Sequence, residues 1–249
     1  MKHLKLFESF NEEDIYTMCE KYGIKNYTIN KDGSIDVDGD VYLANNNLTE
    51  LSLKFRNVTG GFYCHNTKLT SLECSPESVD GDFNCASSRL DSLEGCPKSI
   101  GHVFNCSSNN LKSLDNGPKS VGSGFFCADN ILTSLKGCPE SVSGGFDCSY
   151  NQLTSLEGCP KYVSRSFYCD NNKITTFEHL PFSMGGEFYC ADNPIYQIWK
   201  LFADYSKIEF LNDCDAIREP NIIVLDRLNF FLEEIGEPTV TEVKGYKCI

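Results

Sequence analysis

The chain of 249 residues carries 22 Lys and Arg against 35 Asp and Glu, which gives a formal net charge of −13. This excess of acid argues against a nucleic-acid backbone or an anionic membrane surface as partner, because both are bound through clustered basic residues. No apolar run reaches the roughly 18–20 residues that cross a bilayer, and the N-terminus lacks the continuous apolar stretch of a secretory signal.

The first predicted element is a helix over residues 11–22. Asn11 can cap its N-terminus, Ile15 and Cys19 lie on one apolar stripe, and Gly23 can end it. This helix would cover the N-terminal end of the repeats that follow.

A hairpin and an acidic turn are predicted next. Two β-prone segments, residues 27–30 and 34–37, flank a Lys-Asp-Gly turn. The run from Asp36 to Asp40 suggests calcium, but an EF-hand loop needs a Glu where Asn47 stands, so an acidic turn is the simpler interpretation. We expect residues 1–40 to form an N-terminal helix and hairpin cap.

A repeat of 21 residues organises most of the remaining chain. Phenylalanine precedes each repeated cysteine by two residues, and Leu or Ile follows it by five. The repeated cysteines are Cys64, Cys85, Cys106, Cys127, Cys148, Cys169 and Cys190. A fixed period with fixed apolar phases indicates stacked units, each burying its apolar face on the next. An atypical first unit begins at Val41, so we predict about eight rungs over residues 41–199.

The fourteen cysteines are expected to be buried and reduced. Equivalent positions of stacked units point the same way, so neighbouring Cβ vectors are parallel, which suits disulfide geometry poorly. No CxxC pair supports zinc, and we predict no metal and no cofactor. A disulfide ladder or a metal site is the alternative. Reduced thiols indicate a cytoplasmic location.

Each rung is expected to contain one short strand and one turn. Phe146 and Cys148 alternate with a polar residue, which predicts a strand with both apolar side chains inward. Asn151 recurs at its phase in most rungs, where its side chain can bond the backbone of neighbouring rungs as a ladder. Pro160, which also recurs, stiffens the segment that returns to the next strand.

The repeat resembles the leucine-rich repeat family. The family pattern LxxLxLxxNxLxxL aligns with Phe146-x-Cys148-x-x-Asn151-x-Leu153-x-x-Leu156, and Leu-Thr-Ser-Leu-x-x-x-Pro is similar to the short bacterial repeats. The resemblance covers about 160 of the 249 residues. It implies an α/β repeat fold, a curved solenoid whose strands form a parallel sheet on the concave face. Phe and Cys replace two strand leucines, which puts the curvature in question.

The C-terminal 50 residues break the period. Residues 196–205, 207–217 and 223–235 are predicted to be helical, and residues 239–243 to form a strand. Because the last rung of a solenoid needs a cover, we expect residues 200–249 to form a mostly helical cap. An independent binding or catalytic role for this segment is the alternative.

The outward strand positions and the residues after each cysteine are the candidate binding site. They form an aromatic stripe edged by carboxylates: Tyr42, Tyr63, His65, Phe126, Asp129, Asp147, Tyr150, Tyr168, Asp170 and Tyr189. Exposed aromatics are enriched at protein interfaces, and the carboxylates favour a partner protein with a basic surface. Cross-strand stacking that only stabilises the sheet is the alternative.

No catalytic residues are predicted. The four histidines occupy different phases or lie outside the repeats, and no phosphate-binding loop, HExxH or GxSxG is present. Cys214 followed by Asp215 resembles, over two residues alone, the catalytic cysteine of some leucine-rich repeat effectors with ubiquitin-ligase activity. An enzyme confined to the C-terminal segment is therefore kept as an alternative.

These features predict a non-enzymatic module that binds a partner protein on its concave face. Leu6-Phe7-Glu8 resembles the cleavage site of N-terminal capsid-targeting peptides in T4-like phages. That resemblance implies a phage protein acting on host or defence machinery in the host cytoplasm. It equally supports an alternative, a structural protein of the virion interior.

Overall fold

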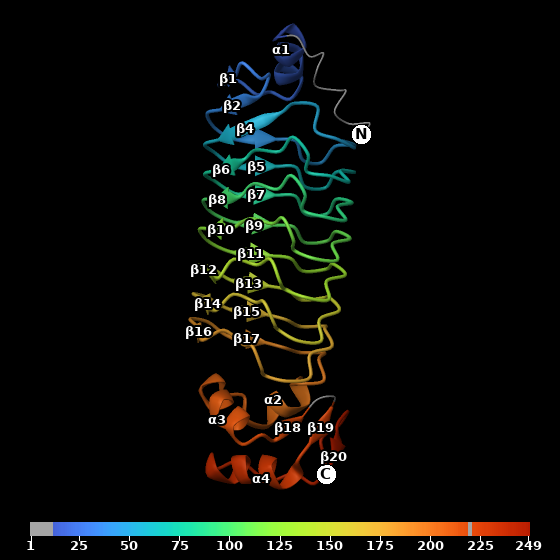
Figure 1. Ribbon diagram of the computed structural model, residues 1–249, viewed down its shortest axis with the longest axis vertical. Helices are drawn as coiled ribbons and strands as arrows, with labels where there is room; N and C mark the ends of the chain where they lie inside the picture. The colour runs from blue at the N-terminus through green and yellow to red at the C-terminus, as the bar shows by residue number, and fades with distance from the viewer. Residues whose placement is uncertain (1–11, 219–220) are drawn as a thin grey trace.

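The computed structural model describes residues 12–218 and 221–249. Rungs with two short strands each stack along a nearly straight axis, and helices lie at both ends of the stack (Figure 1). The repeated solenoid of parallel strands expected from the 21-residue period is therefore present.

The main sheet consists of the strands that contain the repeated phenylalanine. Its strands are β3 (Val41–Tyr42), β5 (Phe62–Tyr63), β7 (Phe83–Asn84), β9 (Phe104–Asn105), β11 (Phe125–Phe126), β13 (Phe146–Asp147), β15 (Phe167–Tyr168) and β17 (Phe188–Tyr189). All eight pair in parallel in the order in which they follow in the chain. Phenylalanine faces phenylalanine at every step from β5 to β17, as equal rung lengths require.

The return segment of each rung also forms a strand, which was not predicted. These strands are β4 (Phe55–Val58), β6 (Ser78–Val79), β8 (Ser99–Ile100), β10 (Ser120–Val121), β12 (Ser141–Val142), β14 (Tyr162–Val163) and β16 (Ser183–Met184). They form a second sheet in two parts, one ending at β10 and the other running from β12 to β16. In most of them a buried β-branched residue follows an outward polar one, the pattern of a half-buried strand.

The straight axis follows from having strands on both sides of each rung. Neighbouring strands lie about 4.8 Å apart, whereas packed helices lie about 8–10 Å apart. A solenoid with helices on one side must therefore curve, but here both sides have the strand spacing (Figure 1). The stack differs in this respect from the expected curved solenoid, so the outward surface of the main sheet is called the main face rather than a concave face.

The core is a column of phenylalanines beside a column of cysteines. From Phe62 to Phe188, neighbouring ring centroids lie 5.0–6.1 Å apart. The seven repeated cysteines are buried beside them, and all fourteen cysteines of the chain are free thiols. Burial raises the pKa of Cys64 to about 12. The expected burial is confirmed for nine of the fourteen cysteines, and the other five are half-buried.

We expect the buried thiols to react with a chromogenic disulfide reagent only when the protein unfolds. Burial excludes the reagent, and a raised pKa leaves little of the reactive thiolate. At mildly alkaline pH the unfolded chain should show fourteen fast thiols. The folded protein should show at most the five that are half-buried, namely Cys74, Cys138, Cys159, Cys214 and Cys248. Fast labelling of the repeated cysteines in the folded protein would contradict the expected burial.

The predicted asparagine ladder is confirmed, and Asn151 shows its geometry. Its Nδ2 donates to the carbonyls of Cys127, Cys148 and Ser149, each at 3.1 Å. Its Oδ1 accepts from the backbone N–H of Leu132 at 2.9 Å. One buried amide thus satisfies backbone groups in two rungs, and Asn109, Asn130, Asn172 and Asn193 repeat the donor pattern.

The N-terminal helix and hairpin are also present. Helix α1 spans Glu12–Lys21, and β1 (Tyr27–Ile29) pairs antiparallel with β2 (Ile35–Val37). Strand β2 then pairs in parallel with β4, which joins the hairpin to the second sheet. The proposed helix cap Asn11 and the Leu6-Phe7-Glu8 segment lie outside the described residues.

The C-terminal segment mixes helices with a small sheet. It contains α2 (Tyr196–Phe202), a 3-10 helix (Tyr205–Lys207), α3 (Ile208–Asp213), β18 (Ile217–Arg218), β19 (Ile222–Ile223), α4 (Leu225–Glu234) and β20 (Lys247–Cys248). The predicted strand at residues 239–243 is wrong. The helices are also shorter than expected, because β19 pairs with both β18 and β20, which takes residues 217–218 and 222–223 out of the helices. Trp199 packs edge-on against Phe188 of the last rung, with ring centroids 5.1 Å apart.

Candidate protein-binding face

Two stacked tyrosine pairs lie on the main face, one near each end of the sheet. The rings of Tyr42 and Tyr63 lie 5.0 Å apart with 7° between their planes, and those of Tyr168 and Tyr189 lie 4.6 Å apart with 2°. Parallel strands in register place equivalent side chains side by side, so the stacking follows from the repeat. The pairs remain accessible, since Tyr42 is 63% exposed and Tyr189 is 38% exposed.

Carboxylates fix the hydroxyl groups of the two outer tyrosines. Tyr42 Oη donates to Asp40 Oδ2 at 2.9 Å, and Tyr189 Oη donates to Glu187 Oε2. Each hydrogen bond raises the pKa of its tyrosine, because the phenolate would face a negative charge. Sequence reasoning missed Asp40 and Glu187. Each carboxylate precedes its tyrosine by two residues, a spacing that places both side chains on the same face of an extended chain. This spacing was the signal that could have found them.

Glycines support the half-buried rings of the main face. A Cβ at Gly61 would lie 2.5 Å from the Tyr63 ring, and one at Gly124 would lie 2.7 Å from the Phe126 ring. Both rings therefore lie close against the backbone two residues earlier. The fold itself thus restricts the positions of both rings.

Polar side chains interrupt the aromatic stripe. Asp147 Oδ1 accepts from the backbone N–H of Ser149 at 2.9 Å, and Asn84 and Asn105 make the same bond in their own rungs. These side chains bond the backbone where each strand ends. The main face therefore presents two aromatic ends and a middle in which Phe126 is the one aromatic residue among polar ones, rather than one continuous stripe.

The remaining predicted site residues lie at the turn after each strand. Asp129 and Tyr150 are exposed at left-handed backbone positions, both with φ of 55°. Asp170 is half-buried and accepts from the N–H of Ala191 at 2.7 Å, and burial raises the pKa of its carboxyl. His65 is also half-buried, and its Nδ1 has no hydrogen-bond partner among the described residues.

The charge of the main face is one-sided. Neither the main-sheet strands nor the two positions after each repeated cysteine contain Lys or Arg. The same positions carry Asp129, Asp147, Asp170 and Asp192. Unneutralised carboxylates beside exposed aromatics favour a partner surface rich in Lys or Arg.

The acidic turn is occupied by the protein's own side chains. Asp36 forms an ion pair with Arg56, and Asp38 Oδ1 accepts from Thr59 Oγ1 at 2.9 Å. Asp40 accepts the tyrosine hydroxyl described above. Across residues 12–218 and 221–249, no group of three or more His, Cys, Asp or Glu could hold a metal ion.

Cys214, the candidate nucleophile of the C-terminal segment, lacks the surroundings of an activated thiol. Burial raises the pKa of Cys214, whereas catalysis needs a thiolate. The neighbouring Asp215 forms ion pairs with Arg218, at 2.9 Å, and with Arg227.

Within the described parts of the chain, no helix is long and apolar enough to cross a membrane.

No family model, curated protein or solved structure matches the chain. Function is therefore inferred from the side chains of the main face and their surroundings.

Proposed function

We propose that the chain is a non-enzymatic solenoid of the leucine-rich repeat type that binds a partner protein with a basic surface through its main face. The observation that carries this proposal is the pair of accessible tyrosine stacks beside carboxylates, on a face without Lys or Arg. The asparagine ladder and the 21-residue period support the repeat type.

The geometry suits recognition by fixed anchors. Tyrosine provides a large contact area at low entropy cost and is enriched among interface residues that dominate affinity. Here Tyr42 and Tyr189 are each held by a stacked neighbour and a carboxylate. Asp129 and Asp192 lie after the strands, where they can meet basic groups of the partner and steer its approach.

The two ends of the chain act in this proposal as caps. A terminal rung exposes apolar surface and unpaired backbone groups unless something covers it. Helix α1 and the hairpin of residues 12–40 would cover the first rung. The segment from residue 200 onward would cover the last one, with Tyr205 Oη donating to Pro181 O and Tyr246 Oη to Thr175 O at 2.7 Å.

We expect the double substitution Tyr42→Ala/Tyr189→Ala to weaken partner binding by at least about tenfold, that is by about 1.4 kcal/mol or more. Both side chains are exposed, so the fold should survive, which circular dichroism checks. Affinity capture from a lysate of the source cell identifies the partner, and calorimetry with the purified partner measures the change.

The matched control is Tyr16→Ala/Tyr162→Ala. These tyrosines are 54% and 50% exposed but lie outside the main face, so binding should stay within about twofold of wild type. Loss of binding in this control, with binding retained in the main-face variant, would place the site elsewhere and overturn the proposal.

A further inference from the structure

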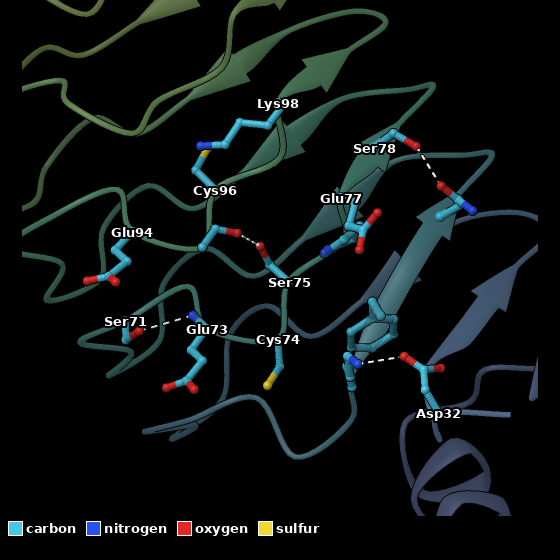
Figure 2. A pocket seen from close by; sticks show the side chains of 15 residues that line it. Asp32, Ser71, Glu73, Cys74, Ser75, Glu77, Ser78, Glu94, Cys96 and Lys98 are labelled. Atoms are coloured by element: carbon cyan, nitrogen blue, oxygen red, sulfur yellow. Dashed lines mark hydrogen bonds and ion pairs between the residues drawn. The ribbon is translucent and has the colours of Figure 1, made fainter. Parts of the chain in front are cut away.

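The first rungs leave a groove of about 1180 Å³ where the chain turns into the second sheet (Figure 2). It is lined by residues of three consecutive rungs and by Asp32 of the hairpin turn. None of its lining residues belongs to the main face, so any ligand here would bind independently of the proposed partner.

The groove coincides with an irregular first rung. Strand β4 begins at Phe55, two residues ahead of the phase at which β6 begins. The next rung makes a corner instead, with Cys74 in a left-handed conformation at φ of 73°. In the third rung Gly95 holds this position, and a Cβ there would lie 2.4 Å from Leu72 O. In the third rung, the preceding rung thus leaves no room for a side chain at this corner. In the second rung the same corner carries the side chain of Cys74, which faces the groove (Figure 2).

The groove has an apolar lining and an acidic border. Its apolar lining is Cys74, which is half-buried, together with Phe55 and Pro76, which are buried beneath it. Figure 2 shows Glu73 on one side of Cys74 and Glu77 on the other. A binding site of this kind suits a ligand that carries both apolar and cationic groups.

The glutamates of the border form no ion pair with any described residue, although the charge of Arg56 acts on Glu77. Glu73 and Glu94 occupy the same phase of adjacent rungs, in the turn before the second sheet, so their like charges repel each other. Of the ion pairs among the described residues, none involves Glu73, Glu77 or Glu94. Their negative charge is therefore available to a ligand.

Both lysines of the lining are already engaged. Lys54 Nζ lies 2.6 Å from Asp32 Oδ2 in an ion pair. Lys98 Nζ donates to the backbone carbonyl of Asn116 at 2.7 Å. The hydrogen bond to a neutral carbonyl leaves Lys98 charged, but the lining carries four carboxylates (Asp32, Glu73, Glu77 and Glu94) against two lysines. Its net charge of −2 is complementary to a basic ligand.

We propose that this groove binds an extended basic peptide segment of a partner protein. In an extended chain successive side chains point to opposite sides. A segment that alternates lysine or arginine with apolar residues can therefore place its cations beside Glu73, Glu77 and Glu94 while an apolar side chain packs on Cys74.

Cys74 provides a reporter inside the groove. It is half-buried, and burial raises the pKa of its thiol to about 11. Alkylation of Cys74 by iodoacetamide at alkaline pH reports whether the groove is covered, and peptide mass mapping measures its extent. The probe is an acetylated, amidated peptide of alternating lysine and leucine. It should slow alkylation of Cys74 by about tenfold at saturation, because the reagent reaches only free protein.

The substitutions Glu73→Gln/Glu94→Gln should raise the dissociation constant of the probe by about tenfold or more. The matched control is Glu157→Gln/Glu178→Gln, which removes the same two charges at the same phase of later rungs, outside the groove. It should leave the constant within about twofold. Both pairs are exposed, so the fold should be kept.

Three results would overturn the proposal. The first is equal weakening by both double substitutions, which would indicate binding to overall charge. The second is equal protection of Cys74 by a glutamate–leucine peptide or by spermidine alone. The third is an absence of any protection by the probe. The probe should protect Cys74 in the Tyr42→Ala/Tyr189→Ala variant as well as it does in wild type. This proposal and the proposed function can therefore fail separately.

Discussion

Replacing Phe125 by Ala is expected to lower the free energy of unfolding by about 3–5 kcal/mol. The Phe125 side chain is fully buried, and its ring lies 5.0 Å from Phe104 and 5.6 Å from Phe146 by centroid. Truncation removes contacts with both neighbouring rungs and leaves a cavity in the middle of the column. Since a solenoid is held together by nearest-neighbour interfaces, two interfaces are weakened by one substitution.

Guanidinium unfolding followed by far-ultraviolet circular dichroism measures this effect. The matched control is Phe182→Ala, because Phe182 is 75% exposed and should contribute less than about 1 kcal/mol. Similar losses in the two variants would mean that the phenylalanine column is not the stabilising core.

Replacing Asn151 by Ala is expected to cost about 2–4 kcal/mol of unfolding free energy. The substitution leaves the buried N–H of Leu132 without its acceptor. It also removes one of the two donors to each of the carbonyls of Cys127, Cys148 and Ser149. The matched control is Asn46→Ala in the first rung. Asn46 is exposed, and among the described residues its side chain bonds only Leu43 and Leu48 of its own rung. Its loss should therefore cost about 1 kcal/mol.

The isosteric change Asn151→Asp tests the direction of the hydrogen bonds. A carboxylate at this position would face three carbonyl oxygens, so its pKa in the folded protein should rise above the unfolded value of about 3.9. Relative to wild type, the variant should therefore lose stability as pH rises through that raised pKa and recover part of it at lower pH. Denaturant titrations at several pH values measure the difference. A variant whose stability relative to wild type does not change with pH would contradict the donor role of the amide.

Much of the stack could be predicted because residues with the same packing role recur at the same position of successive repeats. Phe146 and Cys148 belong to columns in which every rung after the first has the same apolar residue. Asn151 recurs where a buried amide is needed to satisfy backbone groups, and the ladder it implied is present. A single rung would not have distinguished these positions from chance.

The second sheet could not be predicted from the same evidence. A strand such as Ser99–Ile100 is two residues long, too short for an alternating pattern to be told from a loop. Its pairing with residues 21 positions away in each direction decides its conformation. The small C-terminal sheet escaped for a related reason, since Ile222–Ile223 pairs with Lys247–Cys248 near the end of the chain.

The candidate site was predictable in its aromatic residues and less so in its polar ones. Tyr42 and Tyr189 followed from strand alternation, but their carboxylate partners Asp40 and Glu187 required attention to the preceding turn. Tyr150 could be placed near the strand but not oriented, because its direction depends on a left-handed backbone angle that its residue type does not favour.

In a straight, evenly spaced stack, the number of rungs between two residues of the main face fixes the distance between them. Tyr63 and Tyr168 are 105 residues apart, which is five repeats of 21. At about 4.8 Å for each rung, their strands are separated by about 24 Å along the axis. Loss of one whole rung from the middle of the stack would shorten this distance by a single step of about 4.8 Å and leave both tyrosine pairs intact. The number of rungs, rather than the shape of any one of them, thus sets the separation between the two aromatic ends.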